Sequence, residues 1–315
     1  MTRILAVTGA TGVQGGGIIN IMKNQRGWKI RAITRNTSSQ CAIDLVNKGI
    51  EVVAANYDDE KSLSAAFIGV HAIFAVTNWW EHLQQGNSPE ESDKLEEQQG
   101  MNLANAAASI PTLQHYIWST TPHVNGYTVP HFDSKARVDK KIREELPALA
   151  SITTYLSIGW YPQNIAYIPF MQPFINPITK QYMQLMPFAP QARHLVSGDM
   201  NINPGVWVRG ILSSGSKAHG KYANVALEKL SFQEMLDIWA EVTGKKAMYV
   251  QATAETFTNM WGAAGHVMGL QNVLLESCDP WEETDQHVSY DELGIKKEDI
   301  IGYREALEGM KQMWE

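Results

Sequence analysis

Short apolar runs alternate with longer amphipathic stretches along the first half of the chain. The short runs, rich in β-branched and apolar residues, are typical of buried strands. We expect six strands, at Ile4–Thr8, Lys29–Thr34, Glu51–Ala54, Ala72–Val76, His115–Ser119 and Thr153–Ile158. Helical spacing occurs at Gly15–Lys23, Ala42–Lys48, Lys61–Phe67, Glu90–Ala108 and Ser134–Glu145. This alternation predicts an α/β fold with a doubly wound parallel sheet, in which ligands bind beyond the carboxyl ends of the strands.

The pattern changes after residue 158. Several prolines interrupt a stretch rich in aromatic and methionine residues, which excludes one long helix there. A chain of 315 residues is also long for a single compact core. We therefore expect a main α/β domain at residues 1–158, and at residues 159–315 mainly a cap or substrate lobe, some segments of which return to the sheet.

Two elements are expected in the C-terminal half. Lys221–Val225 has the pattern of a strand. Ser231–Val242 has the pattern of a helix, in which Ser231 and Glu234 form a capping box at the start. Gly244 follows as the expected C-cap.

Composition narrows the class of protein. Hydrophobic residues make up 44% and charged residues 19%, as in ordinary globular proteins. The net charge of −7 disfavours direct nucleic-acid binding, since the nearest basic cluster, Lys140 to Arg143, fits a solvated helix face. No apolar run reaches the roughly 18 residues of a membrane span and no signal-peptide pattern is present, so we expect an intracellular, cytoplasmic protein. The two distant cysteines and nine scattered histidines predict neither a disulfide framework nor a metal site.

A glycine-rich turn directly follows the first expected strand. In Gly9-x-x-Gly12-x-x-Gly15, the glycines permit a tight turn, a close approach of the backbone to a pyrophosphate and close packing of helix on strand. The N-terminus of the following helix offers N–H groups to the phosphates. The turn therefore predicts dinucleotide binding by Gly9, Ala10, Thr11, Gly12, Val13, Gln14 and Gly15.

The end of the second strand indicates which dinucleotide binds. An acidic residue at this point usually holds the ribose hydroxyls of NAD, but Arg35 stands here instead. A guanidinium suits the 2′-phosphate of NADP; the alternative is an exposed arginine at a strand end. After the third strand, Asn56 and Tyr57 occupy the loop expected along the adenine, where Asp58 and Asp59 equally suit a helix cap.

The ordered set of motifs resembles the NmrA-like branch of the atypical short-chain dehydrogenases, relatives of the isoflavone and pinoresinol reductases. Besides the glycine turn, it comprises Val76-Thr77-Asn78-Trp79, His131-Phe132-Asp133-Ser134-Lys135 and Tyr161-Pro162-Gln163-Asn164. The resemblance covers nearly the whole chain and implies a Rossmann-like NADP-binding domain with a small C-terminal lobe. It further implies cofactor contacts at Arg35, Asn36, Thr37, Ser38, Ser39, Asn56, Tyr57, Thr77, Asn78, Trp79, Lys135, Tyr161, Pro162, Gln163 and Asn164.

Two positions depart from that family pattern. Asn56 stands where members commonly have Asp, which alters the expected hydrogen bond on the adenine side. Gln98 replaces a Lys found in some members. Neither change removes the expected pyrophosphate site.

The catalytic pair of ordinary short-chain dehydrogenases is altered. Those enzymes place Tyr four residues before Lys, one helical turn apart, whereas this chain has His131 and Lys135. The imidazole is a candidate proton donor, the alternative being a polar residue at a helix start. Resemblance to the isoflavone reductases implies that Lys135 binds the nicotinamide ribose and assists proton transfer; the alternative is a solvated lysine. Ser119 or Thr120, at the end of the fifth strand, is expected to hold a substrate carbonyl, although such residues also cap and turn.

Aromatic residues predict an apolar wall beside the nicotinamide. The candidates are Trp79, Trp80, Trp118, Trp160, Tyr161, Phe170 and Met171, of which Trp118 better suits core packing.

Two functional hypotheses follow from these motifs. The first is an NADPH-dependent reductase that delivers hydride to a carbonyl, imine or activated double bond of an aromatic small molecule. The second is a non-catalytic NADP(H) sensor that acts through a protein partner.

Overall fold

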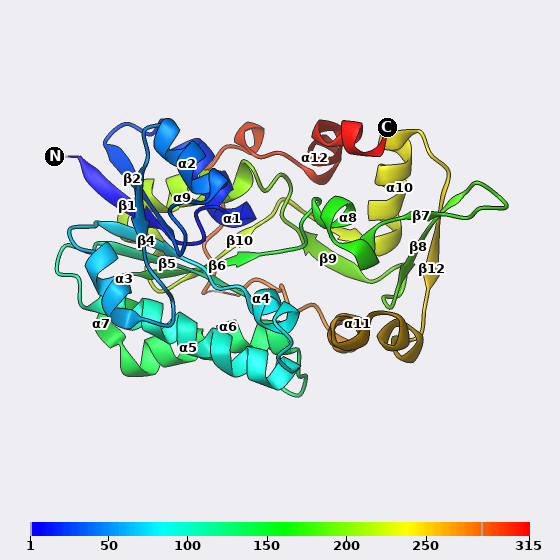
Figure 1. Ribbon diagram of the computed structural model, residues 1–315, viewed down its shortest axis with the longest axis horizontal. Helices are drawn as coiled ribbons and strands as arrows, with labels where there is room; N and C mark the ends of the chain where they lie inside the picture. The colour runs from blue at the N-terminus through cyan, green and yellow to red at the C-terminus, as the bar shows by residue number, and fades with distance from the viewer. Residues whose placement is uncertain (1, 285) are drawn as a thin grey trace.

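The computed structural model describes residues 2–284 and 286–315, which are built around a central parallel sheet (Figure 1). Its seven strands are ordered β10-β6-β5-β4-β1-β2-β3. They are β1 (Arg3–Val7), β2 (Trp28–Thr34), β3 (Glu51–Ala54), β4 (Ala72–Ala75), β5 (His115–Thr120), β6 (Thr153–Ile158) and β10 (Tyr222–Val225). The sheet confirms the predicted Rossmann-like fold, and its strand order reverses between β1 and β4, where such sheets bind ligands.

Helices cover both faces of the sheet (Figure 1). One face carries α1 (Val13–Met22), α2 (Gln40–Asn47) and α9 (Asn203–Ser213), and the other carries α3 (Glu60–Ala66), α5 (Pro89–Ala108), α6 (Pro130–Glu145) and α7 (Pro147–Ala150). Side chains of a strand alternate between faces. Leu5 and Val7 accordingly pack in the cluster of Trp207, whereas Ala6 packs in the cluster of Phe67. Burial on both faces explains why the strands are almost wholly apolar.

The C-terminal half completes the main sheet with β10 and α9. Helix α9 packs on α1 at very short range, because a Cβ on Gly205 would lie 2.6 Å from Gly17 O. A Cβ on Gly17 would in turn lie 2.0 Å from Met200 O. Gly17 and Gly205 therefore serve close packing between segments that are distant in sequence.

The rest of the C-terminal half forms a lobe with its own core. It contains α8 (Asn164–Tyr167), β7 (Phe174–Ile175), β8 (Tyr182–Met186), β9 (Arg193–Val196), β11 (Glu228–Ser231), α10 (Phe232–Thr243), β12 (Ala247–Gln251), α11 (Ala254–Ser277) and α12 (Tyr303–Gly309). Two small sheets have the orders β12-β8-β7 and β11-β9. The capping box of Ser231 and Glu234 opens α10 as predicted, and Gly244 ends it with a φ of +70°.

Several element boundaries differ from those expected. Helix α6 begins at Pro130 rather than Ser134, because the Asp133 carboxylate accepts a hydrogen bond from Val129 N and caps an earlier turn. Helix α1 begins at Val13, within the glycine motif. The short helix α4 (Trp79–Gln84) was not expected, since six residues are too few to show a helical period.

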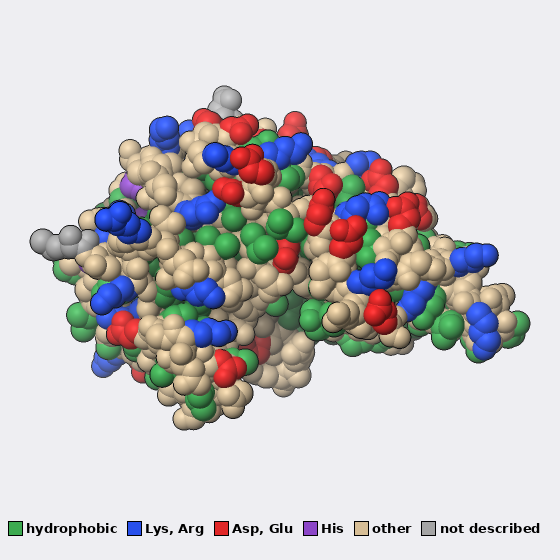
Figure 2. Space-filling model, turned by 90° about the horizontal axis from the view of Figure 1, so that it is seen from above, with side chains coloured by type: hydrophobic (Ala, Val, Ile, Leu, Met, Phe, Trp, Pro, Cys, Tyr) green, Lys and Arg blue, Asp and Glu red, His purple; other side chains and the backbone are tan. Residues whose placement is uncertain are grey.

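The surface carries charges of both signs. On the face in Figure 2, Lys and Arg side chains lie among Asp and Glu side chains. The segment between β7 and β8 projects from the lobe (Figure 1). None of the helices within the described residues is long and apolar enough to cross a membrane.

Candidate cofactor and substrate site

A cavity of about 770 Å³ lies at the reversal of strand order. The segments that follow β1, β2, β4, β5 and β6 line it, and α8, β9 and α11 contribute residues from the lobe. Neighbouring strands are about 4.8 Å apart, so the ends of β2 and β5 are separated by about three such spacings. The cavity is therefore elongated across the sheet, with Arg35 toward one end and Ser119 toward the other.

The glycine turn forms one wall of this cavity. Gly12 N donates to Gly9 O at 2.9 Å, and Gly9 has a φ of +56°, a conformation that favours glycine. A Cβ on Gly15 would lie 2.3 Å from Gly9 O. Gly12 is the N-cap of α1 and makes no side-chain hydrogen bond, which leaves the first backbone N–H groups of the helix for an anion.

Tyr57 supports the turn from the loop after β3. Its Oη accepts a hydrogen bond from Gly9 N at 2.8 Å, and burial raises its pKa. The hydroxyl is thus engaged with the turn. The neighbouring Asn56 does not line the cavity; its Oδ1 accepts from Asp58 N, and Asp59 is the N-cap of α3.

The cavity brings together most of the predicted cofactor residues. Its wall includes Gly9, Thr11, Gly12, Val13, Gln14, Arg35, Tyr57, Thr77, Asn78, Trp79, Lys135, Tyr161, Gln163 and Asn164. The predicted residues outside the wall are Ala10, Gly15, Asn36, Thr37, Ser38, Ser39, Asn56 and Pro162. Asn36 and Ser39 have local roles instead, because Asn36 Oδ1 accepts from Ser38 N and Ser39 is the N-cap of α2.

Arg35 is paired with an acidic residue that the sequence did not indicate. Its Nη1 lies 2.5 Å from Glu81 Oε1, in the first turn of α4, and this hydrogen bond raises the pKa of Arg35. Both side chains line the cavity. The Arg35 side chain is 59% exposed, so a ligand can reach it from solvent.

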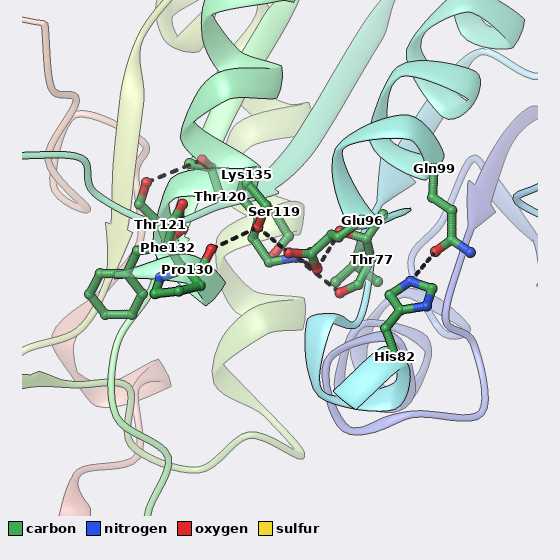
Figure 3. A network of polar contacts seen from close by, with 12 residues as sticks. Thr77, His82, Glu96, Gln99, Ser119, Thr120, Thr121, Pro130, Phe132 and Lys135 are labelled. Carbon is green, nitrogen blue, oxygen red and sulfur yellow. Dashed lines mark hydrogen bonds and ion pairs between the residues drawn. The ribbon is translucent and has the colours of Figure 1, made fainter. Parts of the chain in front are cut away.

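Lys135 lies in a buried polar network (Figure 3). Its Nζ donates to Glu96 Oε1 at 2.5 Å, to Thr77 Oγ1 at 2.7 Å and to Thr77 O at 3.1 Å. Ser134 Oγ donates to the other Glu96 oxygen at 2.5 Å. An ammonium has three N–H groups, and each of them has an acceptor here. Lys135 is therefore not a solvated helix lysine; it fixes the corner between β4 and α4.

Glu96 is the functional candidate that sequence reasoning missed. It lies on the expected helix Glu90–Ala108 and is fully buried. The available signal was its helical spacing with Ser92, Gln99 and Leu103, which marks the inward face of the helix. A carboxylate on such a face requires a cationic or hydrogen-bonding partner.

Gln14 links the glycine turn to the opposite wall. Ser119 Oγ donates to Gln14 Oε1 at 2.8 Å, and Gln14 Nε2 donates to Tyr161 Oη at 2.6 Å. Burial raises the pKa of Tyr161 to about 12. The hydroxyl expected to hold a substrate carbonyl thus lies at the cavity but is bonded to the turn.

Thr120 also lines the cavity, but its hydroxyl is engaged with the core. Its Oγ1 donates to Asp139 Oδ1 at 2.8 Å within the core between β5 and α6. Burial raises the pKa of Asp139 to about 7. Of the two predicted hydroxyls, Ser119 is consequently the better placed to meet a ligand.

His131 lines the cavity but is buried among aromatic rings. Its ring centroid lies 4.7 Å from that of Phe132, 5.2 Å from that of Trp80 and 5.8 Å from that of Trp79. Burial lowers the pKa of His131 to about 3, so the imidazole is neutral at pH 7. An imidazolium that donates a proton at this position is not supported.

The aromatic wall is formed by Trp79, Trp80, Trp160, Tyr161 and Met171. The other two expected members lie elsewhere: Trp118 is wholly buried in the core, and Phe170 packs behind the wall near Trp261.

The lobe adds residues that the sequence did not indicate, namely His194, Met268, Gln271 and Trp281. His194 Nδ1 donates to Leu195 O at 2.8 Å, and Gln271 Nε2 donates to His194 Nε2 at 3.2 Å. Burial lowers the pKa of His194 to about 4, so this part of the wall is uncharged at pH 7. Among the described residues, no cluster of His, Cys, Asp or Glu is arranged to hold a metal ion.

The parallel sheet, the glycine turn and the cavity at the strand reversal define a Rossmann-like α/β protein with a nucleotide-type cleft. A model of the NmrA-like family matches residues 1–293. The chain belongs to the NmrA-like family, in agreement with the resemblance in its motifs.

Curated relatives carry the same family description. The chain is 27% identical over 269 residues to NmrA-like family domain-containing oxidoreductase cpsB of Aspergillus campestris, covering 79% of this chain and 75% of that protein. It is 28% identical over 270 residues to oxidoreductase FrzB of Cladobotryum sp, covering 79% and 76%.

Solved structures share the fold at low sequence identity. The negative transcriptional regulator NmrA, in complex with NADP, superimposes with a TM-score of 0.79 at 20% identity, covering 100% of this chain and 97% of that chain. The triphenylmethane reductase of Citrobacter sp., complexed with NADP(H), gives a TM-score of 0.70 at 17% identity, covering 98% and 99%.

Proposed function

We propose that this protein is an NADPH-dependent oxidoreductase that reduces a carbonyl, imine or activated double bond of an aromatic or hydrophobic small molecule. The observation that carries the proposal is a single cavity in which the glycine turn and Arg35 are continuous with an aromatic wall. The names of the fungal relatives, which are oxidoreductases, support the reaction class. The NADP complexes of the structural neighbours support the choice of cofactor.

The turn offers backbone N–H groups to a pyrophosphate. No side chain caps α1 at Gly12, and the free N–H groups of the helix suit phosphate oxygens. Arg35 would hold the 2′-phosphate. NADPH bound along this path would supply a hydride at the aromatic wall.

The chain's own residues would then orient the acceptor. Trp79 and Trp80 offer flat apolar surfaces to an aromatic ring. Ser119 would exchange its hydrogen bond to Gln14 for one to the acceptor oxygen or nitrogen. Lys135 would release one of its acceptors to bind the nicotinamide ribose and would assist the proton transfer, because neutral His131 is a poor acid.

The second candidate is an NADP(H) sensor without turnover that acts through a protein partner. Two observations favour it: all three N–H groups of Lys135 have acceptors, and His131 is neutral where a tyrosine acid is expected. A structural neighbour described as a negative transcriptional regulator provides the analogy.

NADPH oxidation measured against quinones, imines and enones tests the first candidate. We expect turnover with at least one aromatic acceptor, and a fall of about 100-fold in kcat/KM for Lys135→Met with NADPH affinity changed far less. NADPH binding without turnover on any acceptor would contradict the reductase. A pull-down whose partner depends on the NADPH/NADP ratio would then support the sensor.

A further inference from the structure

The ion pair between Arg35 and Glu81 lies where the 2′-phosphate of the proposed cofactor would bind. Arg35 Nη1 and Glu81 Oε1 are 2.5 Å apart, and both residues line the cavity. We propose that Glu81 is a specificity-determining residue that competes with the 2′-phosphate for Arg35 and thereby lowers the preference for NADP(H) over NAD(H). This inference rests on the proposed function, because it requires a dinucleotide in the cavity.

The two side chains come from elements with different freedom to move. Arg35 follows the end of β2, and its side chain is 59% exposed. Glu81 is on α4, which is anchored on both sides of that position. Trp79 is buried, and His82 Nε2 lies 3.2 Å from Gln99 Oε1 of α5 (Figure 3). A phosphate can therefore draw the Arg35 side chain away, but the Glu81 carboxylate stays beside the phosphate.

This arrangement penalises the 2′-phosphate in two ways. Arg35 must give up its bond to Glu81, which for an exposed pair costs about twofold to fivefold in affinity. The remaining carboxylate then repels the phosphate charge. The 2′-hydroxyl of NAD(H) neither competes for Arg35 nor is repelled by Glu81. A carboxylate at the ribose can instead accept a hydrogen bond from it.

Equilibrium titration of the full chain with NADPH and with NADH tests the proposal. We expect Glu81→Gln to raise NADPH affinity about threefold to tenfold and to leave NADH affinity unchanged or about twofold weaker. In an Arg35→Gln background, the gain in NADPH affinity from Glu81→Gln should be smaller than in wild type, because only the repulsion between carboxylate and phosphate remains.

Glu90→Gln is the matched control. It makes the same charge change on an exposed residue of α5 outside the cavity, so both affinities should stay at the wild-type value. Circular dichroism melting checks that each variant is folded, and Glu81→Ala replaces Glu81→Gln if the latter does not fold.

Each failure has a distinct meaning. A wild-type protein that binds neither nucleotide overturns the proposed function and this inference with it. If wild type binds NADPH but Glu81→Gln does not strengthen that binding, the inference alone is wrong. An equal gain for NADPH and NADH also overturns it, because a general charge effect would then explain the result.

Discussion

Two regions of the cavity wall are built in different ways. The glycine-turn region consists largely of backbone groups: Gly9 with its positive φ, the hydrogen bond from Gly12 and the open N-terminus of α1. The Lys135 region consists of side chains, whose partners are 39 residues away at Glu96 and 58 residues away at Thr77. Changes in the glycine-turn region should therefore affect mainly ligand binding, whereas changes in the Lys135 region should affect stability as well as turnover.

Glu96→Ala tests the Lys135 region and should give the largest effect. The substitution removes the carboxylate from Lys135, Ser134 and Thr77 at once and leaves a buried cation without its counter-charge. We expect the free energy of unfolding to fall by about 3–5 kcal/mol, measured by urea denaturation.

Glu97→Ala is a matched control at the next position. Glu97 pairs with Arg137 and Lys141, whose side chains are partly exposed, so its loss should cost about 1 kcal/mol or less. Replacing both Glu96 and Lys135 by Met should recover most of the stability, because an apolar pair leaves no buried charge. Equal losses of unfolding free energy for Glu96→Ala and Glu97→Ala would contradict the special role given to the buried Lys135 region.

The same difference explains what the sequence could predict. The glycine turn was visible because its geometry is set by residues that are neighbours in the chain. The Glu96 and Glu81 pairs were not visible, because they join α5 to α6 and β2 to α4 through tertiary packing. The neutral state of His131 depends on burial by Trp79 and Trp80, on a helix too short to predict.

At the lobe, the sequence indicated an aromatic wall but not its complete membership. Trp160 and Met171 line the cavity as expected, whereas Gln271 comes from α11, a hundred residues beyond Met171. The strand pattern placed β10 correctly, since a local period decides an element's type. Which lobe residues face the cavity depends on how α11 packs.

Gly15→Ala tests the glycine-turn region and should give the second largest effect. The new Cβ would lie 2.3 Å from Gly9 O and 2.9 Å from Ala10 Cα, so the turn must open. We expect NADPH affinity to fall about 100-fold, as two charge-assisted hydrogen bonds to phosphate are lost. Gly16→Ala is the control: its Cβ meets no atom within 4 Å, and alanine favours the helix, so affinity should be retained. A similar loss for both variants would refute this view of the turn.

The smallest expected effect concerns the pH dependence that His131 imposes. Burial lowers its pKa from 6.5 to about 3, so the folded state does not bind a proton that the unfolded chain binds below pH 6.5. His131 therefore leaves the free energy of unfolding unchanged above pH 6.5. As the pH falls from 6.5 toward 3, it lowers that free energy by up to about 1.4 kcal/mol per pH unit.

His131→Phe should remove this contribution and keep a ring among Trp80 and Phe132. Relative to wild type, the variant should therefore become more stable as the pH is lowered from 7 to 5, measured by urea denaturation at each pH. The exposed His266, changed to Phe, is the control and should follow wild type. His194 is buried and neutral in both proteins, so its effect cancels. Identical pH profiles for His131→Phe and wild type would mean that His131 takes up a proton in the folded state. His131 would then again be a candidate acid beside Lys135. The case for Lys135 as the sole proton-transfer group would be weaker.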